Sequence, residues 1–346
     1  MSHPCRSIAR FMRTVLASFL LATMSAGIAH ATSDRPAFVA GDPPYLERES
    51  VQQFIDGMVA EGFGRAQLEA LFRDVQPQQR VLDLISAPAE ARPWYRYHPI
   101  FLTDQRIEAG KRFWAEHESL LARAEQEFGV EAAIIVAIIG VETFYGRNQG
   151  GFRVLDSLVT LGFDYPPRSG FFRSELGHFL RLAREEGLDL LETRGSYAGA
   201  MGRGQFISSS YREYAVDFSG DGRRDLIGSW ADAIGSVANY FRRHGWARGE
   251  PVVARADADG DDYRRLLGGG YQARHELEEL ARHGVTPVES VPRDGRFSLI
   301  ELETENGHEL WLGYPNFYVI TRYNRSPLYA KAVHLLAEEI NRARRQ

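Results

Sequence analysis

A glutamate stands directly behind a fully apolar stretch of the chain. Residues 132–141 read Ala-Ala-Ile-Ile-Val-Ala-Ile-Ile-Gly-Val, and Glu142 follows at once. If this stretch is a helix, both burial and the partial negative charge of the helix C-terminus raise the pKa of the Glu142 carboxyl. A carboxyl that stays protonated near neutral pH can act as a general acid. The alternative is a helix-end glutamate that points into water or pairs with Arg147.

A second candidate is the glycine-rich segment at residues 195–206. It reads Gly-Ser-Tyr-Ala-Gly-Ala-Met-Gly-Arg-Gly-Gln-Phe. Glycines let a backbone approach a ligand closely, and Ser196 and Gln205 add polar groups. The segment matches neither a P-loop nor a dinucleotide fingerprint. It is therefore either a ligand-binding loop or a tight connection between helices.

A third candidate is an acidic loop that begins like an EF-hand. Residues 217–222 read Asp-Phe-Ser-Gly-Asp-Gly, with oxygen ligands at positions 1, 3 and 5 and glycine at position 6. The match then fails, because position 12 is Gly228 where a glutamate is expected. Asp225 and Asp232 are placed to supply later oxygens. The loop is either a calcium site or a plain Asp/Gly turn.

Aromatic residues gather near the C-terminus together with amides. Aromatic faces and amide groups suit sugar rings, which offer apolar faces and hydroxyls, although core packing also explains such a cluster. Its members are Tyr314, Asn316, Phe317, Tyr318, Tyr323 and Asn324.

Most elements that position these residues are predicted to be helices. The stretch 132–141 fits a buried helix or a buried strand, and its alanines favour a helix. Ser50 is expected to cap the first helix, and Ser326-Pro327 to start the last. Amphipathic patterns predict helices at 51–59, 68–75, 81–85, 107–128, 174–186, 208–216, 230–244, 271–283 and 327–340.

Strand patterns are confined to one region after Trp246. Residues 251–253 and 297–304 alternate like strands, and Asn306-Gly307 separates 300–304 from 309–312 as a hairpin turn would. The chain therefore reads as largely helical with a small β insertion.

Composition narrows the class of protein. The 346 residues favour two or three domains, and 44% hydrophobic with 25% charged residues is ordinary globular composition. A net charge of −5 provides no general basic field, so nucleic acid is not an expected partner.

The first 31 residues are predicted to be a secretory signal peptide. Arg6, Arg10 and Arg13 precede an uncharged, mostly apolar run at 15–28, and Ala29-His30-Ala31 has the form that a signal peptidase cuts. A transmembrane anchor needs an apolar run of roughly 18 residues or more.

The single cysteine also bears on export. Cys5 precedes the apolar run, so the mature chain would carry no cysteine at its N-terminus for a lipid, no disulfide and no thiolate metal site.

Longer motifs run through the mature chain in a fixed order. They include Gly140-Val141-Glu142-Thr143, Gly199-Ala200-Met201-Gly202, Gly204-Gln205-Phe206, Tyr214-Ala215-Val216-Asp217-Phe218, His244-Gly245-Trp246 and Ile320-Thr321-Arg322-Tyr323-Asn324. Taken together they resemble the lytic murein transglycosylase B family.

The resemblance implies an α+β, mainly α fold. It consists of a lysozyme-like helical core, a helical N-terminal domain and a small inserted β domain. The expected boundaries are 32–118 for the N-terminal domain, 119–248 with 314–346 for the core, and 249–313 for the β domain.

The resemblance also implies the activity and its residues. The family cleaves the bond between N-acetylmuramic acid and N-acetylglucosamine in peptidoglycan and forms an anhydromuramic end. Glu142 falls on the family's catalytic acid. Positions that line the groove are matched by Tyr97, Arg168, Ser196, Gln205, Tyr240, Tyr323 and Asn324. The family's calcium loop maps to Asp217, Ser219, Asp221, the Arg223 carbonyl and Asp232, and the segment 224–231 is one residue longer than usual.

One carboxyl suffices for this chemistry because the substrate supplies the other groups. The resemblance implies that the substrate's N-acetyl oxygen would stabilise the anomeric carbon and its own 6-hydroxyl would attack, so Glu142 would act first as acid and then as base. It also implies that no cofactor takes part and that calcium would be structural. We expect a periplasmic monomer that acts on glycan strands, with other cell-wall enzymes as candidate partners.

Two alternatives remain open at this point. A muramidase that uses water needs a second carboxylate, for which Asp156 and Asp164 are candidates, although Asp156 is better explained as a helix cap. A non-catalytic peptidoglycan-binding protein would keep the aromatic groove without needing Glu142.

Overall fold

The computed structural model describes residues 44–87 and 92–346. The predicted signal peptide, residues 1–31, lies outside the described residues. Among the helices that the structure describes, none combines the length and the apolarity needed to cross a membrane.

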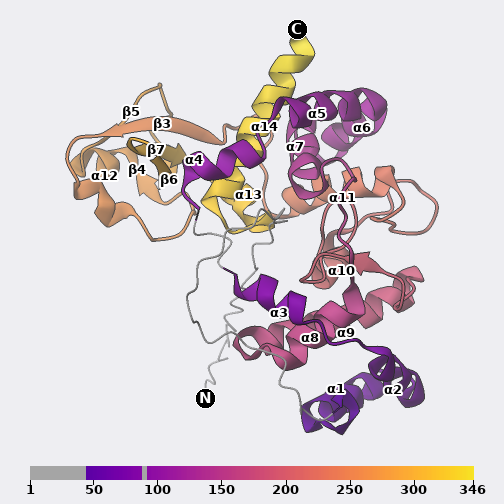
Figure 1. Cartoon of the computed structure of the whole chain (residues 1–346). Coiled ribbons are helices and arrows are strands. Elements are labelled where there is room, and N and C mark those ends of the chain that lie inside the picture. Colours follow the sequence, from indigo (N-terminus) through magenta and orange to yellow (C-terminus); the bar gives the residue numbers. More distant parts are fainter. Residues whose placement is uncertain (1–43, 88–91) are drawn as a thin grey trace, which may run out of the picture.

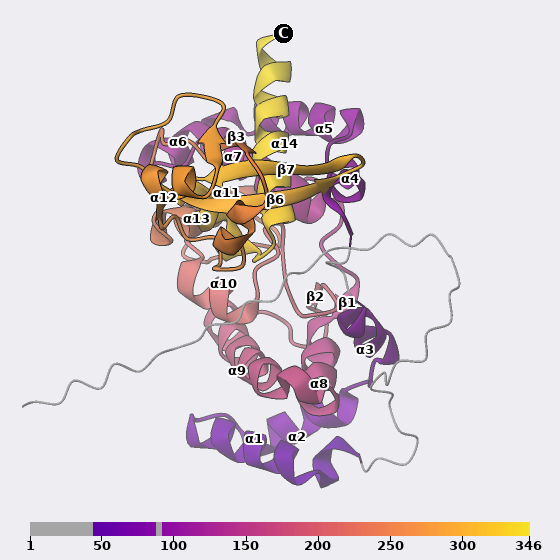
Figure 2. The ribbon, with the colours of Figure 1, turned by 90° about the vertical axis from the view of Figure 1, so that its left-hand side faces the viewer.

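Three N-terminal helices pack against the helices of the lower part of the molecule. They are α1 (Glu49–Ala60), α2 (Arg65–Asp74) and α3 (Gln79–Ser86), and Figures 1 and 2 both place α1 and α2 beneath α8 (Val154–Asp164) and α9 (Ser169–Glu186). The rings of Phe54, Phe72 and Phe163 meet edge to face at centroid distances of 5.9–6.1 Å. Arg48, rather than Ser50, precedes the first turn of α1, which starts earlier than predicted.

The apolar stretch forms α7 (Ala132–Thr143), which resolves the choice between helix and strand. Every residue from 132 to 140 is buried, because neighbouring helices cover α7 on all sides. These neighbours are α5 (Asp104–Glu116), α6 (Glu118–Phe128), α11 (Trp230–Arg243) and α14 (Pro327–Arg345).

The single helix predicted at 107–128 is wrong, because the chain forms α5 and α6 with a break at His117. The His117 backbone (φ −120°, ψ 23°) leaves the helical region, and its N–H closes α5 on the carbonyls of Phe113 and Trp114. The break lets α5 pack on α7 and α14 while α6 packs on α11.

Several short elements connect the main helices. They are α4 (Trp94–Tyr97), the strand pair β1 (Phe152–Arg153) and β2 (Arg194–Gly195), α10 (Ser208–Tyr214) and α13 (Pro315–Tyr323). Helix α9 begins at Ser169, before the predicted residue 174. Ser326 caps α14 as predicted, since its Oγ accepts from the Tyr329 N–H at 3.4 Å.

Apart from the β1–β2 pair, the strands of the described residues form an antiparallel five-stranded sheet with the order β4-β6-β7-β3-β5. Alternate residues of β6 face two different cores: Ile300 and Leu302 join the main core, while Phe297 and Leu299 join a second, smaller one. The strands are β3 (Val253–Ala258), β4 (His275–Glu276), β5 (Val285–Pro287), β6 (Arg296–Thr304) and β7 (Gly307–Gly313).

The predicted hairpin is confirmed, since β6 and β7 pair antiparallel, but its predicted turn residues and one predicted helix are wrong. Thr304 pairs with Gly307, so the hairpin turns at Glu305-Asn306 and Gly307 already belongs to β7. The helix predicted at 271–283 is confined to α12 (Leu277–Arg282), because residues 275–276 pair with the edge of β6 instead. The α+β, mainly α fold class is confirmed, whereas the exact domain boundaries stay a prediction.

Candidate active site

Glu142 lies in the last turn of α7, half-buried, and faces α14. Tyr329 of α14 donates a hydrogen bond to its Oε1 at 2.6 Å. Desolvation raises the pKa of Glu142 to about 8, and the Tyr329 hydrogen bond opposes part of that rise. Arg147 instead lies over the Phe144 ring at 4.9 Å. The carboxyl is therefore set up to hold a proton at neutral pH.

Tyrosine side chains surround this carboxyl. Burial and the nearby Glu142 raise the pKa of both Tyr323 and Tyr329 well above the usual value. Tyr323 donates to the Gly204 carbonyl at 2.6 Å, and its ring centroid lies 4.8 Å from that of Tyr240. Tyr97 is buried close enough to Tyr329 to raise its pKa further. The structure thus brings the predicted groove residue Tyr323 close to the carboxyl, with Tyr240 next to Tyr323 and Tyr97 near Tyr329.

The glycine-rich segment 195–206 is a tight turn built around Ser196. The Ser196 Oγ accepts from the backbone N–H of Ala200 at 3.0 Å and of Ala198 at 3.4 Å. A Cβ on Gly195 would lie 2.3 Å from the Ala200 carbonyl oxygen, so only glycine fits there. Ser196 Oγ is the acceptor in both bonds, so its own O–H remains able to donate.

Gln205 occupies an unusual backbone conformation at the end of this turn. Its φ of 51° is left-handed, and its Nε2 donates to the carbonyls of Gly202 at 2.9 Å and Gln149 at 3.0 Å. These two bonds fix the amide plane and leave Oε1 as an acceptor.

The other predicted groove residues are less closely tied to Glu142. Asn324 is buried, and its Oδ1 accepts from the Ser326 N–H at 3.1 Å, which orders the start of α14. Arg168 lies before α9 over the Phe171 ring at 4.3 Å, and burial lowers the pKa of its guanidinium.

Part of the C-terminal aromatic cluster is core rather than site. Tyr314 and Phe317 are buried in the two cores. The Asn316 side chain satisfies the Ala247 N–H and the carbonyls of Ala247 and Glu250. Core packing therefore explains these three residues.

Both rival carboxylates have basic or hydroxyl partners of their own. Asp156 accepts from Arg153 at 2.6 Å and from the Gln76 N–H at 3.1 Å. It lies inside the first turn of α8 and is not its cap, which corrects that prediction. Asp164 accepts from the Tyr45 hydroxyl at 2.5 Å and from Arg48.

The acidic loop brings three carboxylates together. One oxygen from each of Asp217, Asp221 and Asp232 lies within 4.8 Å of the others. Ser219 donates to Asp217 at 3.1 Å, and the Arg223 N–H donates to Asp221 at 3.0 Å. Hard oxygen donors at this spacing suit calcium.

Asp232 also organises the loop through hydrogen bonds to its backbone. Its Oδ1 accepts from the backbone N–H of Phe218 at 2.8 Å and of Ser219 at 2.7 Å, and its Oδ2 accepts from the backbone N–H of Asp225 at 2.9 Å. Asp225 turns its own carboxylate toward the N–H groups of Ile227 and Gly228 and stays outside the cluster.

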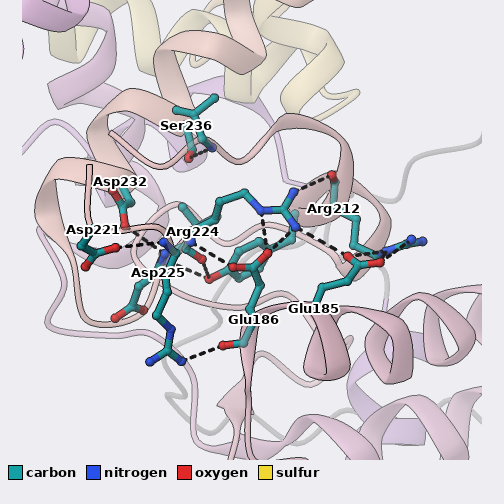
Figure 3. A network of polar contacts seen from close by, with 12 residues as sticks. Glu185, Glu186, Arg212, Asp221, Arg224, Asp225, Asp232 and Ser236 are labelled. Carbon is teal, nitrogen blue, oxygen red and sulfur yellow. Dashed lines mark hydrogen bonds and ion pairs between the residues drawn. The ribbon is translucent and has the colours of Figure 1, made fainter. Parts of the chain in front are cut away.

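A polar network fastens this loop to the neighbouring helices, as Figure 3 shows. Arg224 donates to Glu186 of α9 through Nε at 2.6 Å and to the Arg212 carbonyl of α10 through Nη1 at 3.0 Å. Arg212 in turn holds Glu185 at 2.7 Å. The loop is therefore a fixed part of the helical framework.

Sequence reasoning missed Tyr329 and Thr143. Tyr329 lies on the apolar stripe of α14 together with Val333 and Leu336. A tyrosine on such a stripe carries a hydroxyl that needs a buried hydrogen-bond partner, and this was the signal that the sequence offered. Nothing in the sequence identifies its partner, which lies 187 positions away.

Comparison with known proteins adds an independent line of evidence. A family model described as a transglycosylase SLT domain matches residues 47–338. Membrane-bound lytic murein transglycosylase B of Escherichia coli (strain K12) is 43% identical over 315 residues, which cover 87% of this chain and 85% of that protein.

Solved structures agree over nearly the same span. Soluble lytic transglycosylase SltB1 from Pseudomonas aeruginosa is 51% identical with a TM-score of 0.80, covering 86% of this chain and 100% of that one. Escherichia coli Slt35 in complex with calcium is 43% identical with a TM-score of 0.79, covering 90% of this chain and 96% of that one.

Proposed function

Because this chain belongs to the transglycosylase SLT domain family, we propose that Glu142 is the single acid and base with which it acts. The protein is a lytic murein transglycosylase, an enzyme acting on peptidoglycan. The observation that carries the proposal is the half-buried carboxyl at the end of α7, whose pKa is raised to about 8.

The reaction needs a proton at the start and a base at the end. Glu142 donates its proton to the oxygen between N-acetylmuramic acid and N-acetylglucosamine, and the bond from that oxygen to the anomeric carbon breaks. The N-acetyl oxygen of the muramic sugar stabilises the positive carbon. Its 6-hydroxyl then attacks, gives its proton to Glu142 and leaves a 1,6-anhydro ring.

The substrate's own groups replace the second carboxylate that other glycosidases use. Groups already held in one molecule need no separate encounter, which lowers the barrier. Asp156 and Asp164 are engaged by Arg153 and Arg48, which favours this route over a water-dependent muramidase. No cofactor is required in it.

Ser196 and Gln205 are proposed to orient the muramic sugar. The free O–H of Ser196 is suited to donate to the acetamido oxygen, and the Gln205 Oε1 is suited to accept from a hydroxyl. The remaining groove positions are proposed for Tyr97, Arg168, Tyr240, Tyr323 and Asn324. Of the three tyrosines only Tyr323 is partly exposed and suited to offer its ring to a sugar, whereas the buried Tyr97 and Tyr240 would support the groove from within.

Calcium is proposed to bind the acidic loop in a structural role. The ligands would be the side chains of Asp217, Ser219, Asp221 and Asp232 with the Arg223 carbonyl. The converging carboxylates and the calcium complex of Slt35 support this assignment. The ion would stiffen the loop between α10 and α11.

We also propose that the protein is exported to the periplasm as a monomer after removal of residues 1–31. Peptidoglycan is the substrate there, and other cell-wall enzymes are candidate partners.

Glu142→Gln tests the catalytic assignment. The amide keeps shape and polarity but cannot transfer the proton, so clearance of purified peptidoglycan should fall by roughly 10²–10⁴-fold. Glu301→Gln is the matched control, because Glu301 is also half-buried and accepts from a tyrosine hydroxyl, that of Tyr263, at 2.5 Å, a bond that an amide oxygen keeps, but it lies in strand β6. Near wild-type clearance by Glu142→Gln would favour the binding-protein alternative.

A further inference from the structure

Thr143, the residue after Glu142, connects three backbone segments through one hydroxyl. It is 1% exposed. Its Oγ1 lies 2.9 Å from the Arg203 carbonyl oxygen in the glycine-rich turn and 3.2 Å from the Ile139 carbonyl in α7, and it accepts from the Gly146 N–H at 2.9 Å. A hydroxyl has one proton, so the shorter distance makes Arg203 the favoured acceptor.

The backbone that Thr143 holds is strained. Phe144 (φ 50°) and Tyr145 (φ 57°) are consecutive non-glycine residues in the left-handed region. Such conformations persist only where the surroundings impose them, and they gather at functional sites. The Thr143 bond to Gly146 spans this pair and closes the turn.

The Tyr145 ring also holds this turn in place. It stacks on Phe113 at 5.4 Å and fits against two glycines, since a Cβ on Gly110 or Gly140 would lie 2.4 or 2.5 Å from its hydroxyl oxygen. The chain thus leaves α7 in one defined direction immediately after Glu142.

We propose that Thr143 is a positioning residue for the reaction: it ties the end of α7, and with it Glu142, to the turn that carries Ser196 and Gln205. The acid and the groups that orient the sugar come from segments that are far apart in sequence. The bond to Arg203 is a direct link between them. This inference rests on the proposed role of Glu142.

Thr143→Val removes the hydroxyl and keeps the shape of the side chain. We expect kcat to fall between about 10- and 100-fold with a smaller change in KM, because a small displacement of a catalytic group has effects of this size. If Glu142 gains water as it moves, its pKa falls toward the ordinary value. The basic limb of the kcat/KM profile should therefore move to lower pH. Thr143→Ser keeps the hydroxyl and should restore most of the activity.

Thr160→Val is the control for a purely structural effect. Thr160 is also fully buried, and its Oγ1 accepts from the Gln78 N–H at 3.1 Å, away from Glu142. It should lower the melting temperature without moving the pH profile. If Thr143→Val does not fold, Thr143→Cys, a weaker donor, takes its place in comparison with Thr143→Ser.

The outcomes separate this inference from the proposed function. A wild-type pH profile and kcat in folded Thr143→Val, while Glu142→Gln is inactive, would overturn the positioning role alone. Activity in Glu142→Gln would instead overturn the catalytic assignment on which it rests.

Discussion

At the scale of single residues, two opposing effects set the proton affinity of Glu142. Burial raises its pKa to about 8, while the Tyr329 hydroxyl favours the charged form and lowers it. An acid must hold its proton before the bond breaks, and a base must then take one up. A pKa near the working pH serves both steps.

Replacing Tyr329 by Phe should separate these effects. Without the donor the charged form loses stabilisation, so the Glu142 pKa rises above about 8 and the basic limb of the pH–rate profile moves to higher pH. We expect kcat to fall as well, by about 10-fold or more, since the carboxyl loses its fixed orientation.

Tyr263→Phe is the matched control for that measurement. Tyr263 also donates to a carboxylate, Glu301, at 2.5 Å, but it lies in the second core. Removing the Tyr263 hydroxyl should leave the basic limb of the pH–rate profile in place. An unchanged limb in Tyr329→Phe would show that the Tyr329 hydrogen bond does not tune Glu142.

The role of a single residue can be predicted from the sequence only where the signal for that role is local. Glu142 is recognisable because the apolar run directly precedes it. The roles of Tyr329 and Thr143 depend on partners 187 and 60 positions away. Single-sequence patterns carry no record of such pairings.

At the scale of elements, one residue of the acidic loop, Asp232, has two structural roles. Asp232 caps three backbone N–H groups and also offers an oxygen to the cluster with Asp217 and Asp221. Arg224 and Glu186 also fasten the loop to α9. Calcium would add its own bonds to these contacts and stabilise the folded loop further.

Asp221→Asn tests the calcium assignment. An amide oxygen keeps the Arg223 N–H bond but removes a charged ligand. For the wild type, calcium at 100-fold above its Kd should raise the melting temperature by on the order of 5 °C, through binding to the folded state alone. Asp221→Asn should lose that rise. Asp225→Asn, outside the cluster, should keep the calcium-dependent rise in melting temperature. Equal changes in melting temperature in the two variants would show that the loop is a plain turn and not a calcium site.

Element boundaries show what local patterns can and cannot predict. Ser326-Pro327 marks the start of α14 correctly because capping is a local signal. The break at His117 was missed because the apolar pattern continues across it, and the interruption is set by packing on α7, α11 and α14. The hairpin turn was displaced by one residue because Gly307 pairs within the strand.

At the scale of the whole molecule, the C-terminal helix returns to the centre of the chain. Helix α14 packs on α7, and the sheet contacts α14 through Trp311, whose ring centroid lies 3.1 Å from the buried Lys331 Nζ. The active-site carboxyl therefore depends on segments from both halves of the chain. Hydrophobic patterning predicted the helices and the β insertion, but their assembly into one core was implied only by the family resemblance.

The central claim is that one carboxyl, with groups of the substrate, cleaves the glycan without water. Weighing the muropeptides that the purified protein releases from peptidoglycan tests it most directly. We predict products without a reducing end, each lighter by one water than the hydrolysis product, because the muramic 6-hydroxyl closes on its own anomeric carbon. Reducing-end products from the first time point would contradict the claim and return attention to Asp156 and Asp164 as the second carboxylate.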